Sequence, residues 1–350
     1  MNRYRIELFK RADMEYAGMA ECSEPEISID YIVSSQSKVI CPGEVIATSG
    51  DFAQIRINGK IYFQGIVVDA NYDDVRTEIT INQLSEVLNT ETFANVELLK
   101  TKSIEEWLSD ILNNLFNGTD ASQNLPNFTI VRQSATSGTH TASDYGIYNV
   151  YDLVVSFFKV YGVIVDFEFD YMTRSFTCTM HAVTETSYSY DLSVSDVLSY
   201  EIQSSLSSDS PNKMIIREQE NPANSITYYW HPSEFSGTVD TDSSTDRVLP
   251  VKTKCEAIML NEGETFESAA YSAAVNALYT TRYDDLITVT VRADSLLFNE
   301  WSIGQLFTLY ANGKTYNTML TGIHKESMAS IDLTFGYVRK RLTQILKMRK

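Results

Sequence analysis

The sequence has few cysteines, and none of them forms a recognisable motif. Its 350 residues include only Cys22, Cys41, Cys178 and Cys255. No two of them have the Cys-x-x-Cys spacing of a zinc ligand pair or a redox pair. We therefore expect the four cysteines to serve as small buried apolar side chains.

Long hydrophobic runs are also absent. No stretch reaches the roughly 18 consecutive apolar residues that a membrane-spanning helix needs. The start of the chain, MNRYRIELFKRADM, lacks the apolar core of a signal peptide. The sequence therefore predicts no signal peptide and no stable membrane insertion.

Positive charge is scarce, since 28 Lys and Arg residues face 46 Asp and Glu residues and give a net charge of −18. Nucleic-acid binding relies on Lys and Arg to neutralise phosphates, so this balance argues against a DNA- or RNA-binding protein. Glycine and proline are scarce too, with 15 and 7 residues, while 43% of the chain is hydrophobic. These values are typical of a folded protein with two or three domains.

Motifs for catalysis are missing. The sequence contains no Gly-x-Ser-x-Gly elbow, no phosphate-binding glycine loop and no dinucleotide fingerprint. The four histidines have no metal-ligand spacing; they are His140, His181, His231 and His324. Neighbouring carboxylates could serve a glycosidase, but such neighbours are expected by chance in so acidic a chain; they are Asp73-Asp74, Glu105-Glu106 and Asp284-Asp285. We predict a protein that is not an enzyme, with no catalytic residues, no cofactor and no metal.

Two short stretches allow a binding role. The loop at residues 238–246 holds Asp240, Asp242 and Asp246, which could supply oxygen ligands to calcium, but it lacks the glycine and the distal Glu of a calcium loop. A solvated loop is the favoured interpretation, and ion binding stays open. The aromatic run Tyr228-Tyr229-Trp230-His231-Pro232 could stack on sugar rings, although we favour a buried subunit contact.

The sequence contains the same hairpin pattern at two places. NGKIYFQGIVV occupies residues 58–68 and NGKTYNTMLTG occupies residues 312–322. Asn-Gly favours a type I′ turn, because both central residues of that turn need positive φ. A Gly-led apolar stretch precedes each hairpin, GEVI at residues 43–46 and GQLF at residues 304–307. The similarity predicts a duplicated small β-domain, with chance likeness between hairpins as the alternative.

The rest of the pattern divides the chain into three parts. Residues 1–98 have the alternation of an antiparallel β-barrel. Residues 99–190 predict an α/β module, in which one helix is capped by Ser103, another is capped by Asn149 and ends at Gly162, and a hairpin follows. Residues 191–350 predict a second, similar barrel that contains an inserted helix-bearing segment at about 230–285, with its helix from about Thr265 to Tyr279. The fold class expected is thus mixed β and α+β.

This order of parts resembles the tail hub proteins of tailed phages, including the baseplate hubs of contractile tails and the N-terminal region of siphophage tail-associated proteins. The stretches that carry the resemblance are NVYDLVVSFFKVYGVIVDF, SITYYW followed by RVLPVKTKCEAI, FESAAYSAAVNAL before LITVTVR, and IDLTFGYVRKRLTQILK. Many members of that family continue into a long fibre or a peptidoglycan hydrolase, whereas the sequence here ends at Lys350, so we expect separate proteins to carry receptor binding. The resemblance implies a ring-shaped homotrimer at the tail tip that is not an enzyme.

We therefore expect a structural tail-tip hub of a phage or prophage, located in the virion and assembled in the cytoplasm of the host bacterium. Its partners would be a distal tail protein or tube ring above and receptor-binding, fibre or spike proteins below, with DNA passing through without specific binding. A carbohydrate-binding adhesin or receptor-binding module is the alternative. A basic terminal stretch either complements a helix C-terminus or docks on an acidic neighbour; its basic residues are Arg339, Lys340, Arg341, Lys347, Arg349 and Lys350.

Overall fold

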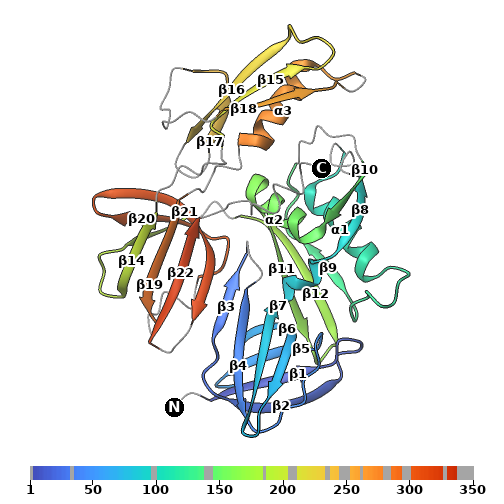
Figure 1. Cartoon of the computed structure of the whole chain (residues 1–350), viewed down its shortest axis with the longest axis vertical. Coiled ribbons are helices and arrows are strands. Elements are labelled where there is room, and N and C mark those ends of the chain that lie inside the picture. The colour runs from blue at the N-terminus through green and yellow to red at the C-terminus, as the bar shows by residue number, and fades with distance from the viewer. Residues whose placement is uncertain are drawn as a thin grey trace.

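Five β-sheets, three α-helices and one 3-10 helix make up the described part of the molecule, which is elongated in Figure 1. The structure is a computed structural model. It describes residues 3–31, 35–95, 101–137, 145–183, 187–203, 211–232, 237–243, 253–260, 263–278, 285–293, 301–325 and 329–336. The predicted β-rich mixed fold is confirmed. No helix in these ranges is long and apolar enough to cross a membrane.

The first sheet, blue at the bottom of Figure 1, contains six strands in the order β2-β1-β5-β6-β7-β4. Alternate residues such as Ile6 and Leu8 face a core on one side of the sheet, while Phe9 faces the other side. The strands are β1 (Tyr4–Phe9), β2 (Tyr16–Cys22), β4 (Gln36–Pro42), β5 (Phe52–Ile57), β6 (Lys60–Tyr72) and β7 (Arg76–Gln83), and the 3-10 helix η1 (Leu84–Leu88) follows them.

The α/β module combines two helices with a three-stranded sheet and a two-stranded ribbon. The caps predicted at Ser103 and Asn149 are confirmed, since their side chains accept hydrogen bonds from the backbone N–H groups of Glu106 and Asp152. Gly162 ends the second helix in the left-handed conformation. The elements are β8 (Glu91–Asn95), α1 (Ile104–Phe116), β9 (Thr129–Arg132), β10 (Tyr145–Asn149), α2 (Val150–Tyr161), β11 (Val163–Asp170) and β12 (Ser175–Ala182).

The second large sheet has the order β13-β20-β21-β22-β19-β14. Its apolar face encloses residues such as Phe307, Leu333 and Phe335. One more strand, β3 (Ile27–Asp30), comes from the N-terminal part of the chain and pairs with β21. The other strands are β13 (Ser187–Asp191), β14 (Val197–Gln203), β19 (Leu286–Arg292), β20 (Leu306–Ala311), β21 (Lys314–Lys325) and β22 (Ser330–Gly336).

A separate small sheet, in the order β17-β16-β15-β18, lies at the top of Figure 1 and packs against one helix. The helix places Ala269, Ala270, Ala273 and Ala274 against the sheet, and these small side chains allow a close approach. The elements are β15 (Lys213–Glu218), β16 (Ser225–Pro232), β17 (Gly237–Asp240), β18 (Thr253–Ile258) and α3 (Phe266–Leu278). The inserted unit therefore includes β15 and begins earlier than the predicted residue 230.

The two Asn-Gly hairpins occupy corresponding places in the two large sheets. Asn58 and Gly59 have φ values of 51° and 83°, and Asn312 and Gly313 have 52° and 73°, as a type I′ turn requires. The first hairpin lies in the antiparallel array β5-β6-β7-β4, and the second lies in the antiparallel array β20-β21-β22-β19. Chain order and sheet order therefore match over four strands.

One part of the predicted correspondence is wrong. Gly43 directly follows β4, and Val45 and Ile46 lie in the connection to β5, where Ile46 is 82% exposed. Gly304 instead lies two residues before the start of β20, and Leu306 and Phe307 are buried strand residues. The two Gly-led stretches are thus not structural equivalents.

The sheets also cross the predicted domain boundaries. β3 belongs by sequence to the first region, yet it pairs with β21, and β13 begins at Ser187 but pairs in parallel with β20. The first sheet and the α/β module share one core, in which Phe9 and Phe52 pack against Phe169. The first sheet, the α/β module and the second large sheet are therefore joined by shared strands and a shared core, and they are not three independent domains in sequence order.

Candidate functional site

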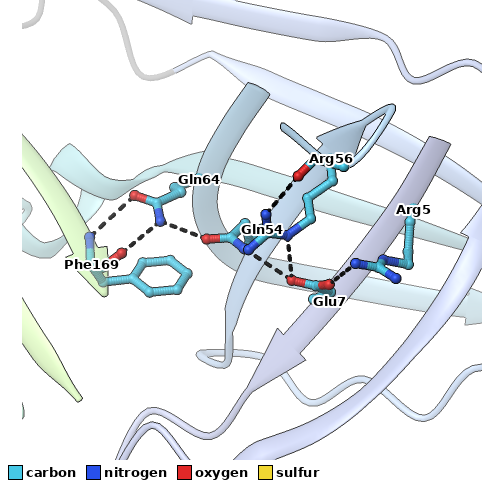
Figure 2. A network of polar contacts seen from close by, with 7 residues as sticks. Arg5, Glu7, Gln54, Arg56, Gln64 and Phe169 are labelled. Atoms are coloured by element: carbon cyan, nitrogen blue, oxygen red, sulfur yellow. Dashed lines mark hydrogen bonds and ion pairs between the residues drawn. The ribbon is translucent and has the colours of Figure 1, made fainter. Parts of the chain in front are cut away.

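A network of polar contacts lies where the first sheet meets the α/β module (Figure 2). The Gln64 side chain on β6 donates to the carbonyl oxygen of Phe169 at 2.7 Å and accepts from its backbone N–H at 3.1 Å. One amide side chain thereby satisfies both backbone groups of a residue on β11, as a neighbouring strand would. We call this contact, together with its supporting residues Arg5, Glu7, Gln54 and Arg56, the glutamine joint.

Buried side chains hold Gln64 in position. Gln54 is fully buried; its Oε1 accepts from Gln64 Nε2 at 2.9 Å, and its Nε2 donates to Glu7 Oε2 at 3.0 Å. Arg56 Nε donates to the same Glu7 oxygen at 2.8 Å, and Arg5 pairs with the other oxygen. Two guanidinium groups therefore neutralise one buried carboxylate, as a stable buried charge requires. The joint is a fixed connection without a free reactive group.

A second connection links the two large sheets. Residues from Ile27 to Asp30 pair with β21, while Glu26 forms a two-way backbone bridge with Lys38 of β4. The Ser28 hydroxyl is hydrogen-bonded to Nδ1 of His324 on β21. One short segment thus carries hydrogen bonds to both sheets.

Lys325, at the end of β21, also reaches the first sheet. Its side chain is 6% exposed, and its Nζ lies 4.9 Å from the ring centroid of Tyr62 on β6. Burial lowers the pKa of Lys325, and the nearby charge of Glu24 acts in the opposite direction. The ring face stabilises an ammonium group that has lost most of its water.

A cavity of about 300 Å³ lies beside these connections. Residues from β3, β6, η1, α2 and β11 line it, together with Ile303. Its polar groups include Asp30 and Asp166, whereas much of the wall is apolar. The cavity marks the meeting point of the first sheet, the α/β module and the second sheet.

Among the carboxylates considered for catalysis, Glu105 makes contacts that stabilise the fold. Glu105 is fully buried in α1 and accepts hydrogen bonds from the Ser134 hydroxyl and from the backbone N–H and hydroxyl of Thr136, at 2.6 to 2.7 Å. Burial alone would raise the pKa of Glu105, but these hydrogen bonds lower it below the ordinary value. Glu105 anchors the chain after β9.

The other acidic pairs are Asp73-Asp74 and Asp284-Asp285. Asp73 caps the turn between β6 and β7, accepting from the backbone N–H groups of Val75 and Arg76 at 2.9 Å. These hydrogen bonds lower the pKa of Asp73. Asp74 is exposed beside it. Asp285 immediately precedes β19, and Asp284 lies outside the described residues.

Among the histidines, His181 pairs with Asp166 at 3.1 Å, and this hydrogen bond raises the pKa of His181. His231 Nε2 lies 3.0 Å from Asp240 Oδ1, and His324 contacts Ser28 as described above. His140 lies outside the described residues. No group of three or more His, Cys, Asp or Glu side chains arranged for a metal ion occurs in the part of the chain that the structure describes.

The two candidate binding stretches are partly occupied by other contacts. Asp240 accepts from the backbone N–H of Asp242 at 2.8 Å, and residues 244–246 of the loop lie outside the described ranges. In the aromatic run, Tyr228 is 6% exposed and its ring packs edge-on against Tyr271 of α3. Trp230 packs against the same core. The run does not present three open rings to a sugar.

Comparison with known proteins gives a consistent result at the level of fold. No family model matches the chain, and no curated protein matches it by sequence. Solved structures do match. The 43 kDa tail protein of prophage MuSo2 from Shewanella oneidensis is 13% identical, with a TM-score of 0.55, and the match covers 96% of this chain and 98% of that chain.

Two further matches agree. Prophage tail protein gp18 from Listeria monocytogenes EGD-e is 11% identical, with a TM-score of 0.53, over 98% of this chain and 97% of its own. A chain of the phage P2 baseplate in its activated conformation with Ca is 11% identical, with a TM-score of 0.52, over 97% of this chain and 100% of its own. The chain therefore has the fold of phage tail and baseplate proteins, as the sequence resemblance implied.

Proposed function

We propose that this protein is a structural component of the tail of a phage or prophage, and specifically a tail-tip hub in the virion. The observation that carries the proposal is the match to tail and baseplate proteins over nearly the full length of both chains. The extensive joints between the first sheet, the α/β module and the second sheet suit a part that must transmit load without changing shape.

The paired four-stranded arrays suggest how such a hub would work. A tail tube is sixfold, whereas a tip that carries one spike or fibre bundle is threefold. In a closed ring of three chains, two similar β-domains per chain present six related faces to a tube ring. The protein would then be a homotrimer whose two β-domains alternate around a central channel.

The charge of the chain fits passage of DNA through that channel. A net charge of −18 repels phosphates, so DNA would slide through without binding. The proposed neighbours are a distal tail protein or tube ring above and receptor-binding, fibre or spike proteins below. The hub itself would be non-enzymatic and would serve host attachment and genome ejection mechanically.

Electron cryomicroscopy of an assembled tail tests the proposal. The expected result is three copies of this chain at the tail tip, with the array containing β6 and the array containing β21 alternating around the axis. Six copies, or arrays that do not alternate, would contradict the adaptor role. A mobility-shift assay with duplex DNA at physiological salt is expected to show no complex.

The alternative is a carbohydrate-binding adhesin, motivated by the aromatic run of β16. The packing of Tyr228 and Trp230 against the α3 core argues against it. A glycan array gives the direct comparison. Specific sugar binding that is lost in Trp230→Ala and retained in Tyr271→Phe would favour the adhesin.

A further inference from the structure

The two cysteines nearest the N-terminus, which are separated along the chain, meet where the edge strands of the first sheet come together. Ser23, the residue after Cys22, donates from its backbone N–H and its hydroxyl to the carbonyl oxygen of Ile40, the residue before Cys41. These distances are 2.9 and 3.2 Å. Further along, Glu26 and Lys38 exchange two backbone hydrogen bonds in antiparallel register. The end of β2 and the segment after it therefore run antiparallel to β4.

The Ser23–Ile40 hydrogen bond places Cys22 directly opposite Cys41, and the register shifts by one residue between this position and the Glu26–Lys38 pair. Because Ile40 directs its carbonyl group toward Ser23, the next pair along the two strands is a non-hydrogen-bonded pair. Facing Cα atoms in such a pair are typically about 4.5 Å apart, within the range of roughly 4.4 to 6.8 Å that a disulfide spans. Both side chains point into the same core, where Cys41 is fully buried and Cys22 packs beside it.

The two thiols already interact. A hydrogen bond from the Cys22 thiol to the Cys41 sulfur raises the pKa of Cys22 and lowers that of Cys41. The remaining cysteines are elsewhere, with Cys178 buried in β12 and Cys255 exposed on β18. All four are free thiols in this structure.

We propose that Cys22 and Cys41 form a disulfide bond under oxidising conditions and thereby crosslink β2 to β4 across the seam of the first sheet. The oxidant is a small disulfide such as oxidised glutathione. One cysteine thiolate breaks the S–S bond of the oxidant and releases one thiol, and the second cysteine then displaces the other. Overall, two protein thiols lose two protons and two electrons, and one oxidant disulfide takes them up to become two thiols.

Under the proposed function, Cys22 and Cys41 would stay reduced in the bacterial cytoplasm and form the disulfide after the virion leaves the cell. Only this timing rests on the proposed function. The crosslink itself is tested on the purified chain, so a failure of the hub assignment in assembled tails and a failure of the crosslink are separate results.

The test incubates the full chain with oxidised glutathione, blocks the remaining thiols with iodoacetamide under denaturing conditions and identifies the linked peptides by mass spectrometry. We expect a peptide that joins Cys22 to Cys41, with glutathione on Cys255. We also expect the melting temperature to rise by about 5 °C and to return after reduction with dithiothreitol.

Two variants separate this crosslink from other thiol chemistry. Cys255→Ser is expected to keep both the linked peptide and the rise in melting temperature, whereas Cys22→Ser is expected to lose both. The peptide analysis of the unmodified sequence decides the question even if Cys22→Ser does not fold. Recovery of Cys22 and Cys41 as separately alkylated residues, after Cys255 has reacted, would overturn the proposal.

Discussion

The arrays β5-β6-β7-β4 and β20-β21-β22-β19 share turn type, strand order and strand direction, but they differ in what lies beside them. β5 has an antiparallel neighbour, β1, whereas β20 has a parallel neighbour, β13. β6 meets the α/β module through Gln64, whereas β21 receives the strand β3. The two arrays therefore share their central strand arrangement, while their edges and faces make different connections.

The largest expected effect comes from glycines within the two long strands, Gly65 in β6 and Gly322 in β21. A Cβ at Gly65 would lie 2.2 Å from the backbone oxygen of Asn82, whereas a Cβ at Gly322 would meet Thr334 at 3.2 Å. We expect Gly65→Ala to lower the free energy of unfolding by about 3 kcal/mol and Gly322→Ala to lower it by less than about 1 kcal/mol. Urea unfolding of both variants measures this, and equal losses would show that the two strands tolerate the same packing.

The glutamine joint provides the next test, because only the first array carries it. In Gln64→Ala, the backbone N–H and C=O of Phe169 lose their side-chain partner, at an expected cost of about 2 kcal/mol. Asn317→Ala on β21 is the matched control: this amide contacts the Thr308 hydroxyl rather than two backbone groups, so the expected cost is below about 1 kcal/mol. Hydrogen exchange should also report faster exchange at Phe169 in Gln64→Ala, and unchanged exchange there would contradict the joint.

The turns should respond alike if the arrays are equivalent. Valine is strained at positive φ, so Gly59→Val and Gly313→Val are each expected to lower the free energy of unfolding by roughly 1 to 2 kcal/mol. Gly18→Val is the control, since Gly18 has no positive φ and open space around its Cβ position. A marked difference between the two turn variants in thermal melts would show that the two turns are not equivalent.

The smallest expected effect lies in the module between the arrays. The hydrogen bond with Asp166 raises the folded-state pKa of His181, so its stabilisation is fully present below the unfolded pKa of about 6.5 and is lost as pH rises through the folded pKa. His181→Gln should therefore cost about 0.5 kcal/mol near pH 5.5 and almost nothing near pH 8, a small value because the Asp166 side chain is 58% exposed. Denaturant melts at both pH values check this, and a cost that grows with pH would contradict the assignment.

Local sequence signals predicted much of the fold. The caps at Ser103 and Asn149, the left-handed Gly162 and both Asn-Gly turns are where the pattern placed them, because each depends on residues within a few positions of one another. Alternation also predicted the hairpin that pairs Phe169 with Phe176. The predicted equivalence of the two Gly-led stretches was wrong, because a glycine with positive φ can follow a strand, as Gly43 does, or precede one, as Gly304 does.

Contacts between distant segments had no comparable signal. Glu105 looked like half of an acidic pair, and only the fold brings Ser134 and Thr136 to its carboxylate. The glutamine joint was missed because Gln54 and Gln64 are ordinary strand residues until β11 packs beside them. A buried polar position in an otherwise apolar alternation, such as Glu7 between Ile6 and Leu8, was the one signal available.

The β-rich composition, the helix ends, the repeated turns and the acidic charge can all be read from residue types and near neighbours, because propensity, capping and net charge depend on nothing further along the chain. Only the tertiary structure decided that β3 joins the second sheet, that β13 lies parallel to β20 and that Cys22 faces Cys41. Such pairings bring together residues far apart in the chain, and their stability depends on shared cores and backbone partners that no local pattern records.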